Sequence, residues 1–326
     1  MAKLLKTQTI LKERYKIAGP IGQGGMGAVY RAEDILLPGR ICAVKEIAPD
    51  SETSPEILTQ IQEQFRQEAA VLARLDHPNL PKVSDYFSQH DREYLVMDFV
   101  PGHDLREIVD QAREEGHFLK EKQVLDWAYQ LCDALSYLHV QESPILHRDI
   151  KPSNIKLTPS GLIKLVDFGL VKLLTSDEAR TVTVVQGRGT AAYTPLEQYG
   201  GDDTHTDTRT DIYALGATLY HLLTGRAPAT ARERFLRPSM LIPPRAINSH
   251  ISPGVEAAIL KALALHPDDR LYDIESFQTM LHQSTVPSKV APLLLTTQEW
   301  QTAIRNNFPL FAILTVLIAL AIYLTP

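Results

Sequence analysis

The segment from His147 to Asp167 constrains this chain more than any other, because it carries three oxygen-bearing side chains at a fixed spacing. Asp149 and Asn154 lie close together in sequence, and Asp167 follows them after a short apolar strand-like run. Transfer of a phosphoryl group needs a carboxylate beside the attacking hydroxyl, and oxygen ligands that hold Mg²⁺ on a triphosphate. Asp149 suits the first task, and Asn154 and Asp167 suit the second.

A glycine-rich turn near the N-terminus provides a second element suited to phosphates. Gly22, Gly24 and Gly27 let the turn close over phosphates without Cβ clashes, so that backbone N–H groups can reach the oxygens. Ile17 to Tyr30 is typical of a hairpin, and Ile41 to Lys45 of a third strand. A dinucleotide-binding turn would lead directly into a helix, so the pattern disfavours a dehydrogenase.

These segments, in this order, resemble the eukaryotic-like serine/threonine protein kinases over roughly residues 15 to 285, and the Gly-Gly-Met-Gly turn resembles the bacterial branch. The resemblance implies an α+β, bilobal protein kinase fold, with a small β-rich N-lobe that carries one regulatory helix and a larger, mainly helical C-lobe. The expected domains are an N-terminal segment (1–14), a kinase domain (15–285, with N-lobe 15–100 and C-lobe 101–285), a juxtamembrane linker (286–306) and a transmembrane helix (307–325).

The resemblance also assigns catalytic roles. Asp149 would orient the substrate hydroxyl and accept its proton late, while Lys151 would steady the phosphoryl charge. Thr190 matches the threonine that Ser/Thr-directed kinases place against such an Asp–Lys pair, so serine or threonine is the expected acceptor. The full expected catalytic set is Asp149, Lys151, Lys45, Glu68, Asn154, Asp167 and Thr190, in which Lys45 contacts the α and β phosphates, Glu68 holds Lys45, and Asn154 and Asp167 bind the metal.

The implied cofactors are ATP and Mg²⁺, with Mn²⁺ as an alternative metal. By resemblance, Met97 guards the adenine pocket and the backbone of Asp98 and Val100 hydrogen-bonds adenine. Lys156 departs from the family pattern, which has an apolar side chain beneath adenine; its aliphatic stem could cover the ring while the amine reaches outward. The residues expected around the nucleotide are Ile21, Gly22, Gln23, Gly24, Gly25, Met26, Gly27, Ala28, Val29, Ala43, Lys45, Met97, Asp98, Val100 and Lys156.

The segment that follows Asp167 is expected to regulate the site. Arg148 suggests control by phosphorylation, because a cation beside the catalytic carboxylate can dock a phosphate. Thr181 and Thr183 are the expected phosphorylation sites, with ordinary loop hydroxyls as the alternative.

Two later carboxylates have expected structural roles. Pro195-Leu196-Glu197 replaces the Ala-Pro-Glu that is usual in the family, and Glu197 could still pair with Arg270. Asp211 opens a strongly apolar helix, and we expect it to hold the backbone of the catalytic loop rather than to act as a second base.

Composition limits the partners. The net charge is −6 and the basic residues are dispersed, which gives no reason to expect nucleic-acid binding. Cys42 and Cys132 have no Cys or His at metal-ligand spacing, so both are expected to be buried thiols in a reducing compartment. Met1 to Tyr15 lacks the uninterrupted apolar stretch of a secretory signal.

The C-terminal region predicts a membrane anchor. Phe308 to Leu324 is apolar except for Thr315 and Tyr323, which is about the minimum length for crossing a bilayer. Arg305 precedes this stretch, so the expected arrangement is a single pass with the kinase domain in the cytoplasm. The alternative is a helix buried against the C-lobe.

Two classes of function remain. The first is a membrane-tethered kinase that phosphorylates itself, through self-association, and other proteins. The second is a catalytically silent scaffold of the same fold. Retention of Lys45, Glu68, Asp149, Asn154 and Asp167 favours the enzyme, because a scaffold has no chemical need for the full set.

Overall fold

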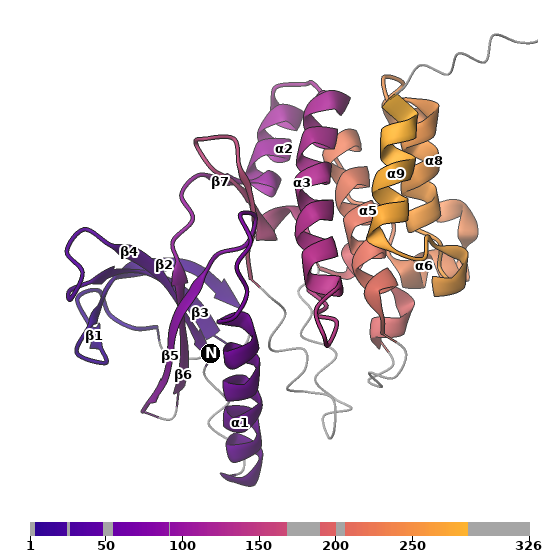
Figure 1. Cartoon of the computed structure of the whole chain (residues 1–326). Helices are drawn as coiled ribbons and strands as arrows, with labels where there is room; N and C mark the ends of the chain where they lie inside the picture. The colour runs from indigo at the N-terminus through magenta and orange to yellow at the C-terminus, as the bar shows by residue number, and fades with distance from the viewer. Residues whose placement is uncertain are drawn as a thin grey trace, which may run out of the picture. The chain divides into compact units, whose positions relative to one another are not determined.

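The computed structural model describes residues 4–24, 27–47, 55–90, 92–167, 190–199 and 206–285, all of which belong to one compact unit, 1–285. Its N-terminal part is a six-stranded antiparallel sheet in the order β1-β2-β3-β4-β6-β5 (Figure 1). The strands are β1 (Ile10–Leu11), β2 (Tyr15–Gly24), β3 (Gly27–Asp34), β4 (Ile41–Ile47), β5 (Val83–Gln89) and β6 (Arg92–Asp98). The predicted hairpin and third strand are therefore confirmed as β2, β3 and β4.

Close packing of β3 on β4 explains one of the glycines. A Cβ atom on Gly27 would lie 1.9 Å from the carbonyl oxygen of Glu46, so any larger residue would push the two strands apart. The N-terminal segment also joins this sheet, because β1 pairs with β2 through Ile10 and Lys16.

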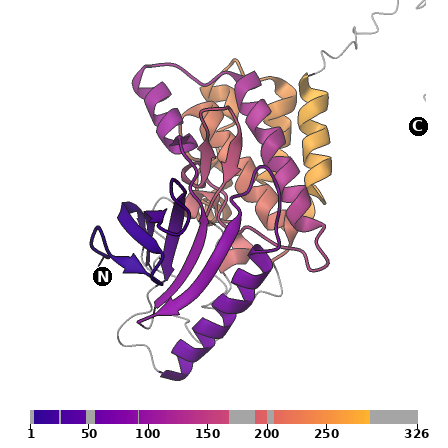
Figure 2. The same ribbon diagram turned by 60° about the vertical axis from the view of Figure 1, so that its left-hand side comes forward.

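Helix α1 (Pro55–Leu72) lies along β5 and β6 (Figure 2). Its buried residues Phe65, Ala69 and Leu72 recur at helical spacing and join the same apolar core as Ile47 and Leu95. The helix is thus held to the sheet by one apolar face.

The second half of the unit is helical. Its helices are α2 (Leu105–Glu114), α3 (Glu121–His139), α5 (Thr208–Thr224), α6 (Ala231–Leu236), α7 (Pro244–Ile247), α8 (Pro253–Ala262) and α9 (Ile274–Thr285). Every residue of α5 from Thr210 to Thr224 is buried, so this helix forms the centre of the lobe. It ends at Gly225, whose φ of 71° is the left-handed conformation that favours glycine.

A small sheet packs against α2 and α3 and contains the two strands that follow the catalytic loop. Strands β7 (His103–Asp104), β8 (Ile155–Leu157) and β9 (Ile163–Leu165) pair in that order, and a 3₁₀ turn, Pro152–Asn154, leads into β8. A β-rich lobe and a helical lobe are therefore present, as expected. Across the described residues, no helix combines the length and apolarity needed to span a bilayer, and the expected span at 307–325 lies outside them.

Candidate active site

The catalytic loop brings four of the expected residues together. Asp149 Oδ2 accepts hydrogen bonds from Lys151 Nζ at 2.8 Å and from Asn154 Nδ2 at 2.9 Å. Lys151 Nζ also lies 3.3 Å from the hydroxyl of Thr190, which comes from the far end of the activation segment. The carboxylate of Asp149, the ammonium of Lys151 and the hydroxyl of Thr190 therefore lie next to one another.

A buried carboxylate fixes the backbone of this loop. Asp211 at the start of α5 is fully buried and accepts the backbone N–H groups of His147 and Arg148, each at 2.9 Å. Burial alone would raise the pKa of Asp211, but these bonds and the one from His139 Nε2, 3.0 Å away, hold it below its ordinary value. The predicted structural role of Asp211 is confirmed, whereas the sequence alone gives His139 no part in the site.

Lys45 reaches across the site from the sheet. Its ammonium forms an ion pair with the carboxylate of Asp167. Asp167 has a φ of 63° and Arg148 a φ of 62°, an uncommon conformation for residues other than glycine. Glu68 lies on α1, but its side chain is outside the described part of the structure, so its pairing with Lys45 stays a prediction.

Two of the residues expected around the nucleotide lie on neighbouring strands. Ala43 of β4 pairs in register with Met97 of β6. The N–H of Asp98 donates to the carbonyl of Lys82 at 3.0 Å, so Asp98 could offer adenine only its carbonyl. Lys156 Nζ lies 3.4 Å from the carbonyl oxygen of Gly102, which agrees with an amine that reaches outward.

The glycine-rich turn is partly described. Gly22, Gln23 and Gly24 end β2, and Gly27, Ala28 and Val29 begin β3 opposite them. Gly25 and Met26 at the tip lie outside the described residues, and so do the phosphorylation sites expected at Thr181 and Thr183.

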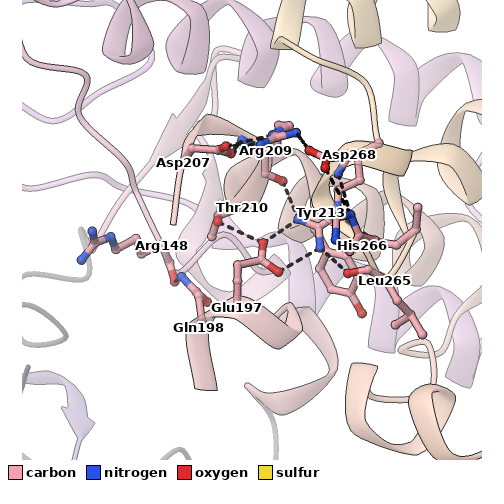
Figure 3. Close-up of polar contacts among 12 residues, drawn as sticks. Arg148, Glu197, Gln198, Asp207, Arg209, Thr210, Tyr213, Leu265, His266 and Asp268 are labelled. Atoms are coloured by element: carbon pink, nitrogen blue, oxygen red, sulfur yellow. Dashed lines mark hydrogen bonds and ion pairs between the residues drawn. The ribbon is translucent and has the colours of Figure 1, made fainter. Parts of the chain in front are cut away.

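The end of the activation segment is anchored by a buried ion pair. Glu197 accepts two hydrogen bonds from the guanidinium of Arg270, at 2.6 and 3.0 Å, and a third from Thr210 at 3.1 Å. The surroundings of Glu197, with Thr210, Arg209 and Tyr213, are drawn in Figure 3. The pairing is confirmed, although Pro195-Leu196 replaces the usual residues before Glu197.

Arg148 lies beside this anchored segment. Its guanidinium donates to the hydroxyl of Thr206 at 3.3 Å. Its carbonyl accepts from the side chain of Gln198 at 3.4 Å (Figure 3). Arg148 thus connects the catalytic loop to residues on both sides of 200–205, which lie outside the described residues.

A buried contact also joins the end of the activation segment to α5, and it predicts that the unfolding free energy falls in acid. The hydroxyl of Tyr193 lies 2.6 Å from Nδ1 of His221. Burial, and then the nearby Arg106, lower the pKa of His221 to about 4, while burial raises the pKa of Tyr193 to about 12. The folded protein therefore favours the neutral form of His221. The contribution of His221 to the unfolding free energy is present above pH ~6.5 and is lost as the pH falls toward 4.

We expect His221→Gln to lose part of this acid sensitivity. Between pH 6.5 and 4 the wild type should lose about 3 kcal/mol of unfolding free energy through this group, and the variant should lose correspondingly less. Urea unfolding at both pH values measures the difference. His250→Gln is the matched control, since His250 is exposed. Equal acid sensitivity in the two variants would remove His221 as the cause.

Comparison with known proteins identifies the family. The model of the protein kinase domain family matches residues 15–283. A probable serine/threonine-protein kinase of Corynebacterium efficiens is 36% identical over 278 residues, covering 80% of this chain and 40% of that protein. The serine/threonine-protein kinase PknB of Mycobacterium leprae is 33% identical over 276 residues, covering 82% of this chain and 42% of that protein. The chain thus spans about two fifths of the length of these curated relatives.

Solved structures agree with this assignment. The apo form of PpkA-294 superposes with a TM-score of 0.71 at 29% identity, covering 86% of this chain and 100% of that chain. The PknI kinase domain of Mycobacterium tuberculosis superposes with a TM-score of 0.64 at 26% identity, again covering 86% of this chain and 100% of that one. The bilobal protein kinase fold is thereby confirmed, and the chain belongs to the protein kinase domain family.

Proposed function

We propose that the chain is a serine/threonine protein kinase, which transfers the γ-phosphoryl group of ATP to serine and threonine hydroxyls of proteins, its own activation segment included. The observation that carries this proposal is the position of Lys151 Nζ, 2.8 Å from Asp149 Oδ2 and 3.3 Å from the hydroxyl of Thr190. A carboxylate, a cation and a threonine so placed support alignment of a small aliphatic hydroxyl for attack.

Asp149 and Lys151 have different roles in the phosphoryl transfer. Asp149 orients the acceptor hydroxyl, whose oxygen bonds to the γ-phosphorus while the bond to the β–γ bridging oxygen breaks and ADP leaves. The hydroxyl proton passes to Asp149 late in this step, because a loose transition state needs little activation of the nucleophile. Lys151 neutralises charge on the transferred phosphoryl oxygens.

The residues around Asp149 fit a magnesium ion. The side-chain nitrogen of Asn154 points toward Asp149, so the side-chain oxygen of Asn154 points away from Asp149. Asp167 supplies a carboxylate. Such hard oxygen ligands suit Mg²⁺, and phosphates and water would complete its shell. Bound there, the ion would neutralise charge on the phosphate oxygens. Lys45, now paired with Asp167, is the cation that would hold the α and β phosphates.

Autophosphorylation provides the test. When the full chain is incubated with γ-labelled ATP and Mg²⁺, label is expected on serine or threonine, with Thr181 and Thr183 as the main sites found by mass spectrometry. Thr181→Ala/Thr183→Ala should lower activity toward an added peptide, because Arg148 loses the phosphate it would dock. Thr158→Ala is the control, because Thr158 lies in the turn between β8 and β9, outside the segment that follows Asp167. Unchanged activity of the double variant would remove the phosphorylation switch.

A catalytically silent scaffold is the alternative, and it makes a different prediction. A scaffold would bind ATP, seen as a rise in Tm with added nucleotide, but would transfer no label to itself or to a peptide. Transfer of label excludes the scaffold.

Membrane attachment is a further part of the proposal, and only the sequence of 307–325 supports it. The full chain expressed in bacteria is expected in the membrane fraction after a carbonate wash, and deletion of 307–325 should move it to the supernatant. A full chain recovered in the supernatant without detergent would contradict the anchor.

A further inference from the structure

A buried carboxylate occupies the face of the N-lobe sheet opposite to Lys45. Glu46 directly follows Lys45 in β4, and successive side chains of a strand point to opposite faces. Glu46 is 2% exposed and lies beside the apolar core formed by Ile17, Val44 and Val96. A charged group in such surroundings is stable only when it is paired and hydrogen-bonded.

Three side chains from two other strands donate to this carboxylate. Tyr30 of β3 donates at 2.8 Å, and from β6 Arg92 donates at 2.5 Å and Tyr94 at 3.2 Å. The backbone N–H of Leu5 donates in turn to the Tyr30 hydroxyl at 3.1 Å. The Glu46 cluster, which comprises Tyr30, Glu46, Arg92 and Tyr94, therefore ties β3, β4 and β6 together on their outer face.

The cluster is joined to the nucleotide side of the sheet through the backbone. In the ladder between β3 and β4, Val29 faces Lys45 and Ala28 faces Glu46. Gly27, which ends the glycine-rich turn, packs against the Glu46 carbonyl so closely that no Cβ would fit. A shift of β4 relative to β3 would therefore move both the Lys45 ammonium and the glycine-rich turn.

The Glu46 carboxylate affects the pKa of two of its donors. The hydrogen bond to Glu46 raises the pKa of Arg92, and burial, together with the charge of Glu46, raises the pKa of Tyr94. The contact between Arg92 and Glu46 is an ion pair, and such charge-assisted hydrogen bonds are the strong ones. A neutral glutamine would replace one acceptor oxygen with an N–H₂ group directed at another donor.

We propose that Glu46 is a positioning residue, which sets the register of β4 against β3 and so aligns Lys45 and the glycine-rich turn on the nucleotide phosphates. Only the predicted change in KM for ATP rests on the proposed kinase function. The alignment itself concerns nucleotide binding and can be measured without any transfer of phosphate.

The test compares Glu46→Gln with Asp34→Asn. Asp34, at the other end of β3, is also 2% exposed and accepts hydrogen bonds from Arg14 at 2.8 Å and from Arg40 at 3.2 Å. It matches Glu46 in burial and pairing but lies away from the glycine-rich turn, which forms the first residues of β3. Both variants should therefore lose comparable stability, while only Glu46→Gln should disturb the phosphate site.

The primary readout is the equilibrium Kd of the full chain for Mg·ATP, measured well below the Tm of each variant. Glu46→Gln is expected to raise this Kd about tenfold or more, because small misplacement of a positioning element is costly even far from the chemistry. Asp34→Asn should keep the wild-type Kd. In the kinetic readout, Glu46→Gln should raise KM for ATP and leave KM for the peptide unchanged.

Tyr30→Phe provides a milder second variant, because it removes one hydroxyl and leaves the carboxylate paired with Arg92. It should raise the Kd for Mg·ATP to a value between those of the wild type and Glu46→Gln. Equal Kd values for Glu46→Gln and Asp34→Asn, or a wild-type Kd in both Glu46→Gln and Tyr30→Phe, would overturn the inference. A wild type that binds ATP but transfers no phosphate would instead overturn the proposed function alone.

Discussion

Asp149→Asn is expected to lower kcat for phosphoryl transfer by about 10²- to 10⁴-fold, the usual contribution of a positioned acid–base group. The amide neither accepts the hydroxyl proton nor pairs with Lys151, which lies 2.8 Å from the native carboxylate. Asparagine has nearly the same shape, and the side-chain nitrogen of Asn154 can still bond to the backbone carbonyl of residue 149 at 2.9 Å. The loop should therefore keep its conformation.

The measurement pairs steady-state transfer to a peptide with equilibrium binding of Mg·ATP. The variant should bind ATP with a Kd near that of the wild type, which separates lost chemistry from lost binding. Asp126→Asn serves as the control, because the Asp126 side chain forms an exposed ion pair with Lys122 on α3. A variant at Asp149 with wild-type kcat would show that this carboxylate has no part in the reaction.

Glu197→Gln is expected to have the largest effect on stability, a loss of about 3–5 kcal/mol in unfolding free energy, which is the usual cost of breaking a buried ion pair by removing one partner. The Arg270 side chain has no exposed surface and that of Glu197 has 7%. Replacing the carboxylate leaves Arg270 as a buried cation without its counter-charge, though its bonds to the carbonyls of Ala264 and Leu265 remain. Urea unfolding measures the loss.

The double variant Glu197→Gln/Arg270→Met distinguishes this cause from a local clash. Once both charges are removed, no buried cation remains uncompensated, and part of the lost free energy should return. Asp126→Asn should cost no more than about 1 kcal/mol, since its ion pair is exposed. A cost of Glu197→Gln as small as that of Asp126→Asn would show that the buried pair contributes little to the fold.

The elements that the sequence predicts well are those with a long stretch of apolar residues. Helix α5 is such a strongly apolar stretch, and it occurs where expected. The start of α5 differs by three residues, because Asp207 caps the helix through the N–H of Arg209 at 2.8 Å, whereas the apolar pattern begins only at Asp211. Capping is a local hydrogen bond that hydrophobic periodicity does not record.

Short elements cannot be predicted from the pattern of apolar residues. Helix α6 has six residues and exposes Phe235 and Leu236 at its end, so its apolar residues do not mark a buried face. Strands β7, β8 and β9 have two or three residues each, too few to show an alternation, and the sequence indicates only a strand-like run before Asp167. Tertiary packing, rather than local pattern, determines these elements.

The catalytic residues were predictable because Asp149, Lys151 and Asn154 lie within one short loop. The Glu46 cluster was not, because the partners of Glu46 lie 16 to 48 residues away in sequence. A single Glu in a strand is usually a surface charge, and only the folded sheet shows that this one is buried.

The central claim is that the chain phosphorylates serine and threonine, and peptide phosphorylation tests it most directly. Three peptides that differ only in a serine, a threonine or a tyrosine acceptor would be incubated with the full chain, γ-labelled ATP and Mg²⁺. We predict transfer to the serine and threonine peptides, little to the tyrosine peptide, and transfer at least about 10²-fold slower in Asp149→Asn. Binding of ATP without transfer to any peptide or to the chain itself, or transfer at the wild-type rate in Asp149→Asn, would contradict the account.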